Sequence, residues 1–165
     1  MRTLEDLIAD KLCDMINYVL AKVIKPDIEI DKVTQLDEDM LIKLKSEFGI
    51  EGVILDVDDT LRKNMNKIPQ CNQEWIESLR GKLKVVILSN GMDKEVESYF
   101  SDRGIDYIGF AHKPLKKNFI KACKQMELEP NKVLVVGDGL YSDIYGGKRN
   151  NMKTVLVKDV DNFDR

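Results

Sequence analysis

The sequence predicts an α/β fold: a three-layer, Rossmann-like parallel sheet with helices on both faces, no cap domain and extra N-terminal helices. Short and almost wholly apolar runs recur along the chain, as in strands buried on both faces. Stretches with apolar residues at spacings of three and four, typical of amphipathic helices, separate these runs. Strands that alternate with helices in this way form parallel sheets covered on both faces.

The first element is an amphipathic helix from Leu4 to Ile24, which Pro26 ends because proline breaks the helical hydrogen bonding. We expect its apolar stripe to pack on the protein's own core. Homo-oligomer formation through this helix is the second alternative, and membrane contact is the least favoured. Acidic and basic residues balance over this segment, whereas helices on anionic lipid are rich in Lys and Arg.

A second N-terminal helix is predicted after an ambiguous, extended stretch over residues 28–36. Asp37 is a typical N-cap for a helix from Glu38 to Phe48, which a glycine closes. We therefore expect two parts. Residues 1–50 form a helical extension packed on the core, and residues 51–165 form the core itself.

The rest of the chain alternates predicted strands and helices. The strands are expected at 53–55, 85–88, near 106–108, at 133–136 and at 155–157. The helices are expected at 73–83, 92–103, 115–127 and 142–150. Folds of this kind bind ligands beyond the carboxyl ends of the strands, so the polar residues that directly follow each strand are candidate site residues.

Four groups of polar residues stand at these strand ends or loop mouths. In chain order they are an acid pair (Asp56, Asp58), a hydroxyl with an amide (Ser89, Asn90), a lysine before a proline (Lys113) and a second acid pair (Asp138, Asp143). Carboxylates this close repel each other unless a cation lies between them. Oxygen ligands without Cys or His nearby favour Mg²⁺. Each group alone is common in turns and helix caps, but together they indicate a phosphate and metal site.

These motifs, over roughly residues 53–157, resemble those of the haloacid dehalogenase superfamily of phosphohydrolases. The resemblance implies a Mg²⁺-dependent phosphomonoesterase. It implies that Asp56 is the nucleophile, which forms an aspartyl-phosphate, and that Asp58 is the general acid and base. Asp56 and Asp138 would ligate Mg²⁺ through their carboxylates, and Asp58 would do so through its backbone carbonyl.

The resemblance also implies how the phosphate is held. Ser89 and Asn90 would bind the phosphoryl group, and Lys113 would neutralise its charge. Asp143 would support either the metal or Lys113. The residue types suit this chemistry, because a phosphate ester repels an attacking carboxylate until its own charge is neutralised.

A narrower resemblance points to the capless class IIIA, YqeG-type subgroup. It is carried by Pro26-Asp27, residues 44–52, Gly137-Asp138 and Gly146-Gly147. This subgroup includes phosphatidylglycerophosphate phosphatases, so a lipid head-group phosphate is one candidate substrate. A broad-specificity small-molecule or protein phosphatase is the alternative. Asp59 and Gly91 each replace an asparagine that is common in the subgroup, which leaves the substrate open.

The motif spacing leaves no room for a cap domain. Residues 59–88 separate Asp58 from Ser89, and residues 90–112 separate Ser89 from Lys113. These gaps hold only a flap, single helices and single strands. An open site suits a bulky substrate or a weakly selective enzyme.

Two rival classes use a similar fold. A signalling receiver domain needs a phosphoacceptor aspartate between the first acid pair and the hydroxyl, and it leaves Asp138 and Asp143 unused. A non-catalytic binding module is the other rival. It is disfavoured because both Asp56 and Asp58 are present.

Composition restricts the partners and the compartment. A net charge of −3 and 7% aromatic residues argue against nucleic-acid binding. Cys13, Cys71 and Cys123 are scattered, and with one histidine they form no predicted zinc site. Unpaired, scattered cysteines suit a reducing cytoplasm, where we expect this protein.

Overall fold

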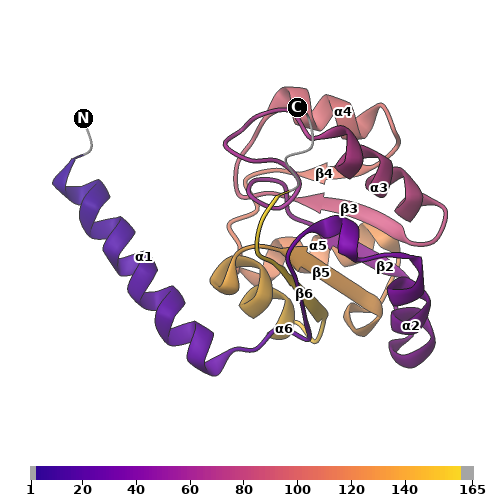
Figure 1. The fold of residues 1–165 in the computed structure, drawn as a ribbon, viewed down its shortest axis with the longest axis horizontal. Helices are drawn as coiled ribbons and strands as arrows, with labels where there is room; N and C mark the ends of the chain where they lie inside the picture. The colour runs from indigo at the N-terminus through magenta and orange to yellow at the C-terminus, as the bar shows by residue number, and fades with distance from the viewer. Residues whose placement is uncertain (1–2, 161–165) are drawn as a thin grey trace.

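The computed structural model describes residues 3–160, and a six-stranded parallel sheet forms its centre (Figure 1). The strand order is β1-β6-β5-β2-β3-β4, and every neighbouring pair is parallel. The strands are β1 (Ile28–Ile30), β2 (Gly52–Leu55), β3 (Lys84–Leu88), β4 (Asp106–Ile108), β5 (Val133–Gly137) and β6 (Lys153–Val157). The predicted α/β fold is confirmed.

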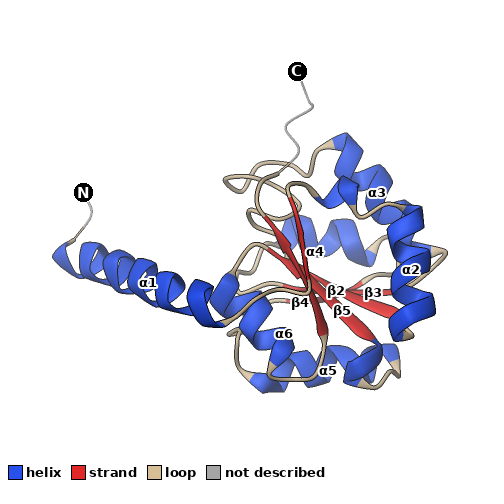
Figure 2. Ribbon diagram, turned by 60° about the horizontal axis from the view of Figure 1, so that its bottom comes forward, coloured by secondary structure: helices blue, strands red, loops and turns tan. Residues whose placement is uncertain are grey.

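Helices cover both faces of the sheet (Figure 2). The α-helices are α1 (Leu4–Val23), α2 (Glu38–Phe48), α3 (Gln70–Arg80), α4 (Lys94–Ser101), α5 (Lys116–Met126) and α6 (Gly146–Lys148). A π-helical turn, η3 (Leu140–Tyr145), and two short 3₁₀ turns, η1 (Val33–Gln35) and η2 (Pro130–Lys132), complete the chain. The predicted helix at 142–150 is thus divided between η3 and α6.

Side chains of each central strand alternate between two apolar cores. Val53 and Leu55 of β2 lie in the core that α2, α3 and α4 cover, whereas Ile54 lies in the core that α5 covers. This alternation follows from the two-residue repeat of a strand. The described residues form a single sheet without a cap domain, as predicted.

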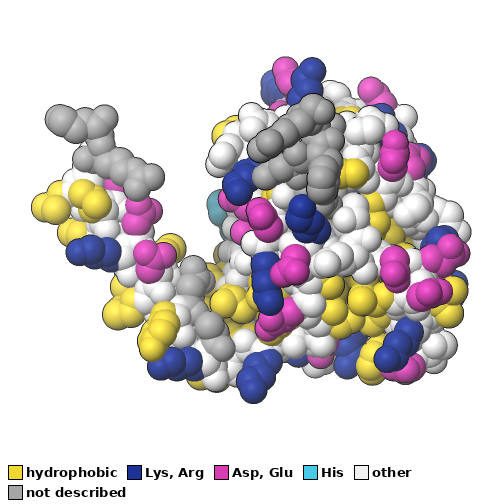
Figure 3. All heavy atoms as spheres, in the orientation of Figure 1, with side chains coloured by type: hydrophobic (Ala, Val, Ile, Leu, Met, Phe, Trp, Pro, Cys, Tyr) yellow, Lys and Arg dark blue, Asp and Glu magenta, His cyan; other side chains and the backbone are white. Residues whose placement is uncertain are grey.

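The position of α1 differs from the expectation that it packs on the core. The helix extends away from the sheet (Figure 1) and contacts η3, and hydrophobic side chains are visible along its surface in Figure 3. Its apolar side chains are exposed: Leu4, Leu7, Ile8, Leu12, Met15, Ile16, Val19 and Val23. Just after α1, the chain is attached to β6: Asp27 Oδ2 accepts hydrogen bonds from the backbone N–H and from the hydroxyl group of Thr154. No helix among residues 3–160 is long and apolar enough to cross a membrane.

Residues 28–48 belong to the sheet and its covering layer: the stretch expected to be extended contains β1, and the predicted helix from Glu38 to Phe48 is α2. β1 pairs with β6 at the sheet edge. Val33 and Leu36 are fully buried, and the Trp75 indole donates a hydrogen bond to the Leu36 carbonyl at 3.0 Å. The division into residues 1–50 and 51–165 stays a prediction.

The Gly146-Gly147 pair allows close packing, as the sequence indicated. A β-carbon on Gly146 would lie 2.5 Å from Phe119 Cζ, and one on Gly147 would lie 2.9 Å from Thr154 Cγ2. The segment after η3 can therefore approach both α5 and the sheet.

We predict that Gly146→Ala and Gly147→Ala each destabilise the protein by about 1–3 kcal/mol, because the added methyl group overpacks the core. Gly81→Ala is the control, since its φ is −80° and no atom lies within 4 Å of its added β-carbon. Urea denaturation measures the three variants. Equal midpoints for all of them would contradict this account of the glycine pair.

Candidate active site

The first acidic motif stands at the carboxyl end of β2, in the middle of the sheet. The Asp56 backbone N–H donates to the Val136 carbonyl at 3.0 Å, so the β2–β5 pairing fixes its position. Asp56 is buried, and both of its carboxylate oxygens have donors. Thr60 Oγ1 donates to Oδ2 at 2.8 Å, and Lys113 Nζ donates to Oδ1 at 2.7 Å. These contacts fix the orientation of the Asp56 carboxylate.

Lys113 joins two buried carboxylates that come from different parts of the chain. Its Nζ lies 2.7 Å from Asp56 Oδ1 and 2.6 Å from Asp143 Oδ1. Burial alone would lower the pKa of Lys113, but the charges of Asp143 and Asp56 outweigh this effect and raise it. Lys113 therefore carries a positive charge between the two acids.

The Asp143 carboxylate forms an ion pair with Lys113 and also contacts the backbone of its own turn. Its Oδ2 accepts from the Gly139 backbone N–H at 3.1 Å. Burial raises the pKa of Asp143 to about 6, while Lys113 opposes this shift. The carboxyl group packs directly on Gly137, where a β-carbon would lie 2.3 Å from Asp143 Cγ.

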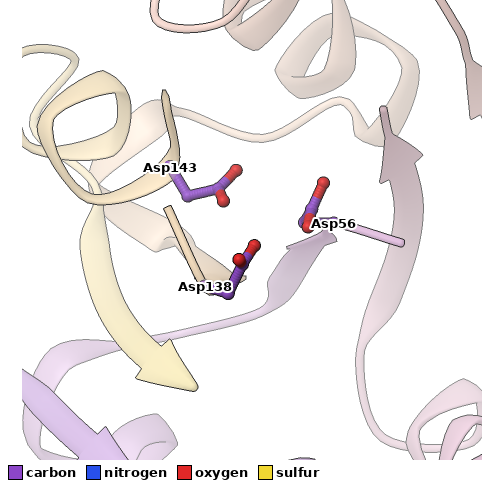
Figure 4. A group of neighbouring side chains, drawn as sticks. All are labelled: Asp56, Asp138 and Asp143. Carbon is purple, nitrogen blue, oxygen red and sulfur yellow. The ribbon is translucent and has the colours of Figure 1, made fainter. Parts of the chain in front are cut away.

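Asp138 completes a cluster of three carboxyl groups (Figure 4). Asp138 is exposed as a residue, but its carboxyl group points toward those of Asp56 and Asp143. One carboxylate oxygen from each residue lies within 4.8 Å of the other two. Partial burial of the carboxyl group, followed by the charges of Asp56 and Asp143, raises the pKa of Asp138 to about 8.

Ser89 and Asp58 face a common space, and Asn90 contacts the backbone of Lys113. A β-carbon placed on Gly91 would be 3.9 Å from Ser89 Oγ and 3.8 Å from Asp58 Oδ2, so both groups face the same space. Asn90 Oδ1 accepts a hydrogen bond from the Lys113 backbone N–H at 2.7 Å, which ties Asn90 to the loop of Lys113. Phosphate binding by Asn90 stays a prediction, and its N–H groups are the donors that it would use.

Three residues of the site were not singled out from the sequence. Thr60 contacts Asp56, and Arg62 contacts both Asp58 and Asp93. The spacing of four between Asp56 and Thr60, and again between Asp58 and Arg62, is the local signal that could have indicated them. Asp93 carries no such signal, because it lies 31 positions from Arg62.

The sequence of the chain is similar to those of hydrolases, including phosphatases. The model of the haloacid dehalogenase-like hydrolase family matches residues 69–151. A probable phosphatase, YqeG of Bacillus subtilis, is 34% identical over 149 residues, which are 88% of this chain and 84% of that protein. Glyceraldehyde 3-phosphate phosphatase of Pyrococcus furiosus is 42% identical over 118 residues, which are 72% of this chain but 39% of that protein.

Solved structures share the fold at low sequence identity. One is a haloacid dehalogenase family enzyme of Bacteroides thetaiotaomicron in complex with magnesium and inorganic phosphate. Its TM-score is 0.57 at 11% identity, over 70% of this chain and 98% of that chain. Another is an uncharacterised protein of Listeria monocytogenes, with a TM-score of 0.54 at 19% identity, over 70% of this chain and 84% of that chain.

We predict that Lys113→Met destabilises the protein by about 3–5 kcal/mol, because Asp56 and Asp143 lose their shared cation while they stay buried. Adding Asp143→Asn should restore part of this loss, since one unpaired charge is removed. Urea denaturation of the single and double variants measures both effects. A double variant less stable than Lys113→Met would contradict the role of Lys113 as the shared counter-ion.

Proposed function

The chain belongs to the haloacid dehalogenase-like hydrolases and is a phosphatase of that family, and we propose that it hydrolyses phosphomonoesters through an aspartyl-phosphate on Asp56. The observation that carries this proposal is the fixed carboxylate of Asp56. Lys113 and Thr60 hold its two oxygens, and Ser89 Oγ and Asp58 Oδ2 both face the space above Gly91.

In the first step, an oxygen of the Asp56 carboxylate attacks phosphorus and the bond to the leaving oxygen breaks. Lys113 and the donors of Ser89 and Asn90 neutralise the phosphoryl oxygens during attack. Asp58 gives its proton to the leaving oxygen, which departs as an alcohol. The products are the free alcohol and the aspartyl-phosphate.

In the second step, water hydrolyses the aspartyl-phosphate. Asp58, now a carboxylate, accepts a proton from the water as its oxygen attacks phosphorus. The bond between phosphorus and the Asp56 oxygen breaks. Inorganic phosphate leaves, the Asp56 carboxylate is restored, and Asp58 is protonated again for the next cycle.

The acidic cluster fits Mg²⁺, because all its ligands are oxygens and it holds more negative charge than Lys113 balances. Burial, followed by the charges of Asp56 and Asp143, raises the pKa of Asp138, and a bound cation would offset this unfavourable environment for the carboxylate. Asp56 and Asp138 would hold the ion through their carboxylates and Asp58 through its backbone carbonyl, while Asp143 supports Lys113. When bound, Mg²⁺ would neutralise charge on the phosphate.

Three substrate classes suit this site. The Asp58 side chain is 42% exposed and no cap among residues 3–160 covers it, which supports a bulky substrate such as a lipid head-group phosphate of the phosphatidylglycerophosphate type. The similarity to glyceraldehyde 3-phosphate phosphatase supports the alternative, a small-molecule phosphatase. A protein phosphatase fits the open site as well.

The partners and the location of the protein stay predictions. The exposed apolar side chains of α1 support a homo-oligomer contact through this helix. Contact with a membrane stays the less favoured alternative, and cytoplasmic location stays an expectation from the cysteine content.

We predict that Asp56→Asn lowers phosphomonoesterase turnover by more than about 10³-fold, since the amide keeps the shape but cannot attack phosphorus. Asp102→Asn, an exposed residue that ends α4, is the matched control and should keep its activity. Phosphate release measures activity, and circular dichroism checks folding. A folded Asp56→Asn variant with near wild-type turnover would disprove the proposed nucleophile.

We also predict that chelation of divalent cations abolishes activity and that Mg²⁺ restores it. Asp138→Ala should raise the Mg²⁺ concentration needed for half-maximal activity by at least about tenfold, because one fixed carboxylate ligand is lost. Calorimetric titration with Mg²⁺ checks the affinity without substrate, and Asp102→Ala is the control. Identical titration curves for Asp138→Ala and the wild type would exclude Asp138 as a ligand.

A further inference from the structure

Arg62 is a buried cation that contacts the Asp58 carboxylate. Its side chain is 4% exposed. Nε donates to Asp58 Oδ1 at 2.8 Å, and Nη1 donates to Asp93 Oδ2 at 2.8 Å. A planar guanidinium that holds two carboxylates in this way has little freedom to rotate.

The backbone places Arg62 over Asp58. Asp59 has a left-handed φ of 60°, and its N–H donates to the Arg62 carbonyl at 2.7 Å. The N–H groups of Leu61 and Arg62 both donate to the Val57 carbonyl, at 2.8 and 3.2 Å. This tight turn brings the residue four positions after Asp58 back beside its carboxylate.

Side chains from α3 and from the start of α4 form hydrogen bonds with this turn. The Asn72 side chain of α3 donates to the Leu61 carbonyl at 2.9 Å. Asp93, the N-cap of α4, accepts from the backbone N–H groups of Glu95 and Val96 through Oδ1 and from Arg62 through Oδ2. Arg62 is therefore fixed at both ends of its guanidinium.

The contact with Arg62 makes the two oxygens of Asp58 unequal. Oδ1 is occupied by the Arg62 N–H. Oδ2 faces the space above Gly91, which Ser89 Oγ also faces. A proton carried on Oδ2 is thus directed to the side where the phosphoryl group would bind.

We propose that Arg62 is a positioning residue, which holds Asp58 Oδ1 so that Oδ2 is the atom that gives the proton to the leaving oxygen and takes it from water. This inference rests on the proposed function. Arg62 contacts neither the cluster of Asp56, Asp138 and Asp143 nor the reacting atoms, and it acts through Asp58 alone.

Kinetics on a leaving-group series separate this role from a purely structural one. The substrates are aryl phosphates with acidic phenols and alkyl phosphates, and kcat/KM is measured because it reports formation of the aspartyl-phosphate. Arg62→Gln should lower kcat/KM about 10–100-fold on alkyl phosphates but only a few-fold on activated aryl phosphates, which need less protonation. Arg80→Gln, which removes an exposed arginine paired with Glu77, is the matched control.

A double-mutant cycle gives the second readout. In the Asp58→Asn background, Arg62→Gln should cause no further loss on alkyl phosphates, because the group it positions is already gone. A further loss as large as in the wild-type background, or an equal loss on every substrate, would overturn the proposal. If Asp58→Asn itself keeps full activity on alkyl phosphates, the proposed acid, and with it the proposed function, fails instead.

Two milder variants keep the test decisive if Arg62→Gln does not fold. Arg62→Lys keeps the charge but cannot hold both carboxylates in one plane. Asp93→Asn keeps an N-cap acceptor for α4 and removes the charge that anchors Arg62. Both should steepen the dependence of kcat/KM on the leaving group. A dependence unchanged from the wild type in both variants would overturn the proposal.

Discussion

The Lys113 ammonium group connects the carboxyl ends of two central strands at the site. It lies between Asp56, which follows β2, and Asp143, which belongs to the turn after β5. All three groups are buried, so each has lost its hydration and depends on the others for compensation. The position of Asp56, the shape of the turn after β5 and the loop before α5 are thus mutually dependent.

Backbone features around this ion group make the contacts sterically feasible. Gly137 has no β-carbon, and the Asp143 carboxyl group occupies that space. The turn that carries Asp143 is π-helical rather than α-helical, and the backbone N–H of Ile144 donates to the carbonyl of Gly139, five positions earlier, at 3.1 Å. Such turns recur at functional sites. Gly146 and Gly147 then let the chain approach α5 and the sheet closely.

Two aspartates only two positions apart have different electrostatic environments. Asp56 is buried and faces Lys113, whereas the Asp58 side chain is 42% exposed and faces Arg62. Side chains two positions apart in an extended chain point to the same side, which explains why both reach one site. Because Asp56 pairs with Lys113 and Asp58 pairs with Arg62, each carboxylate has a cation of its own. Different environments of this kind are consistent with separate chemical roles for two carboxylates.

The sequence by itself determined strands β2 to β6, the parallel sheet and the placement of the polar motifs at strand ends, because these depend on periodicity along the chain. It also determined α2, whose Asp37 cap and Gly49 in the left-handed conformation are local signals. Asp59 needs a left-handed φ, which Asp and Asn both tolerate.

Only the tertiary structure decided four other features: the exposed position of α1, the pairing of β1 with β6, the Asn90–Lys113 contact and the Arg62–Asp93 ion pair. Each of these features joins or separates groups that are remote in sequence. Whether such groups meet depends on how whole elements pack, and local spacing does not encode that packing.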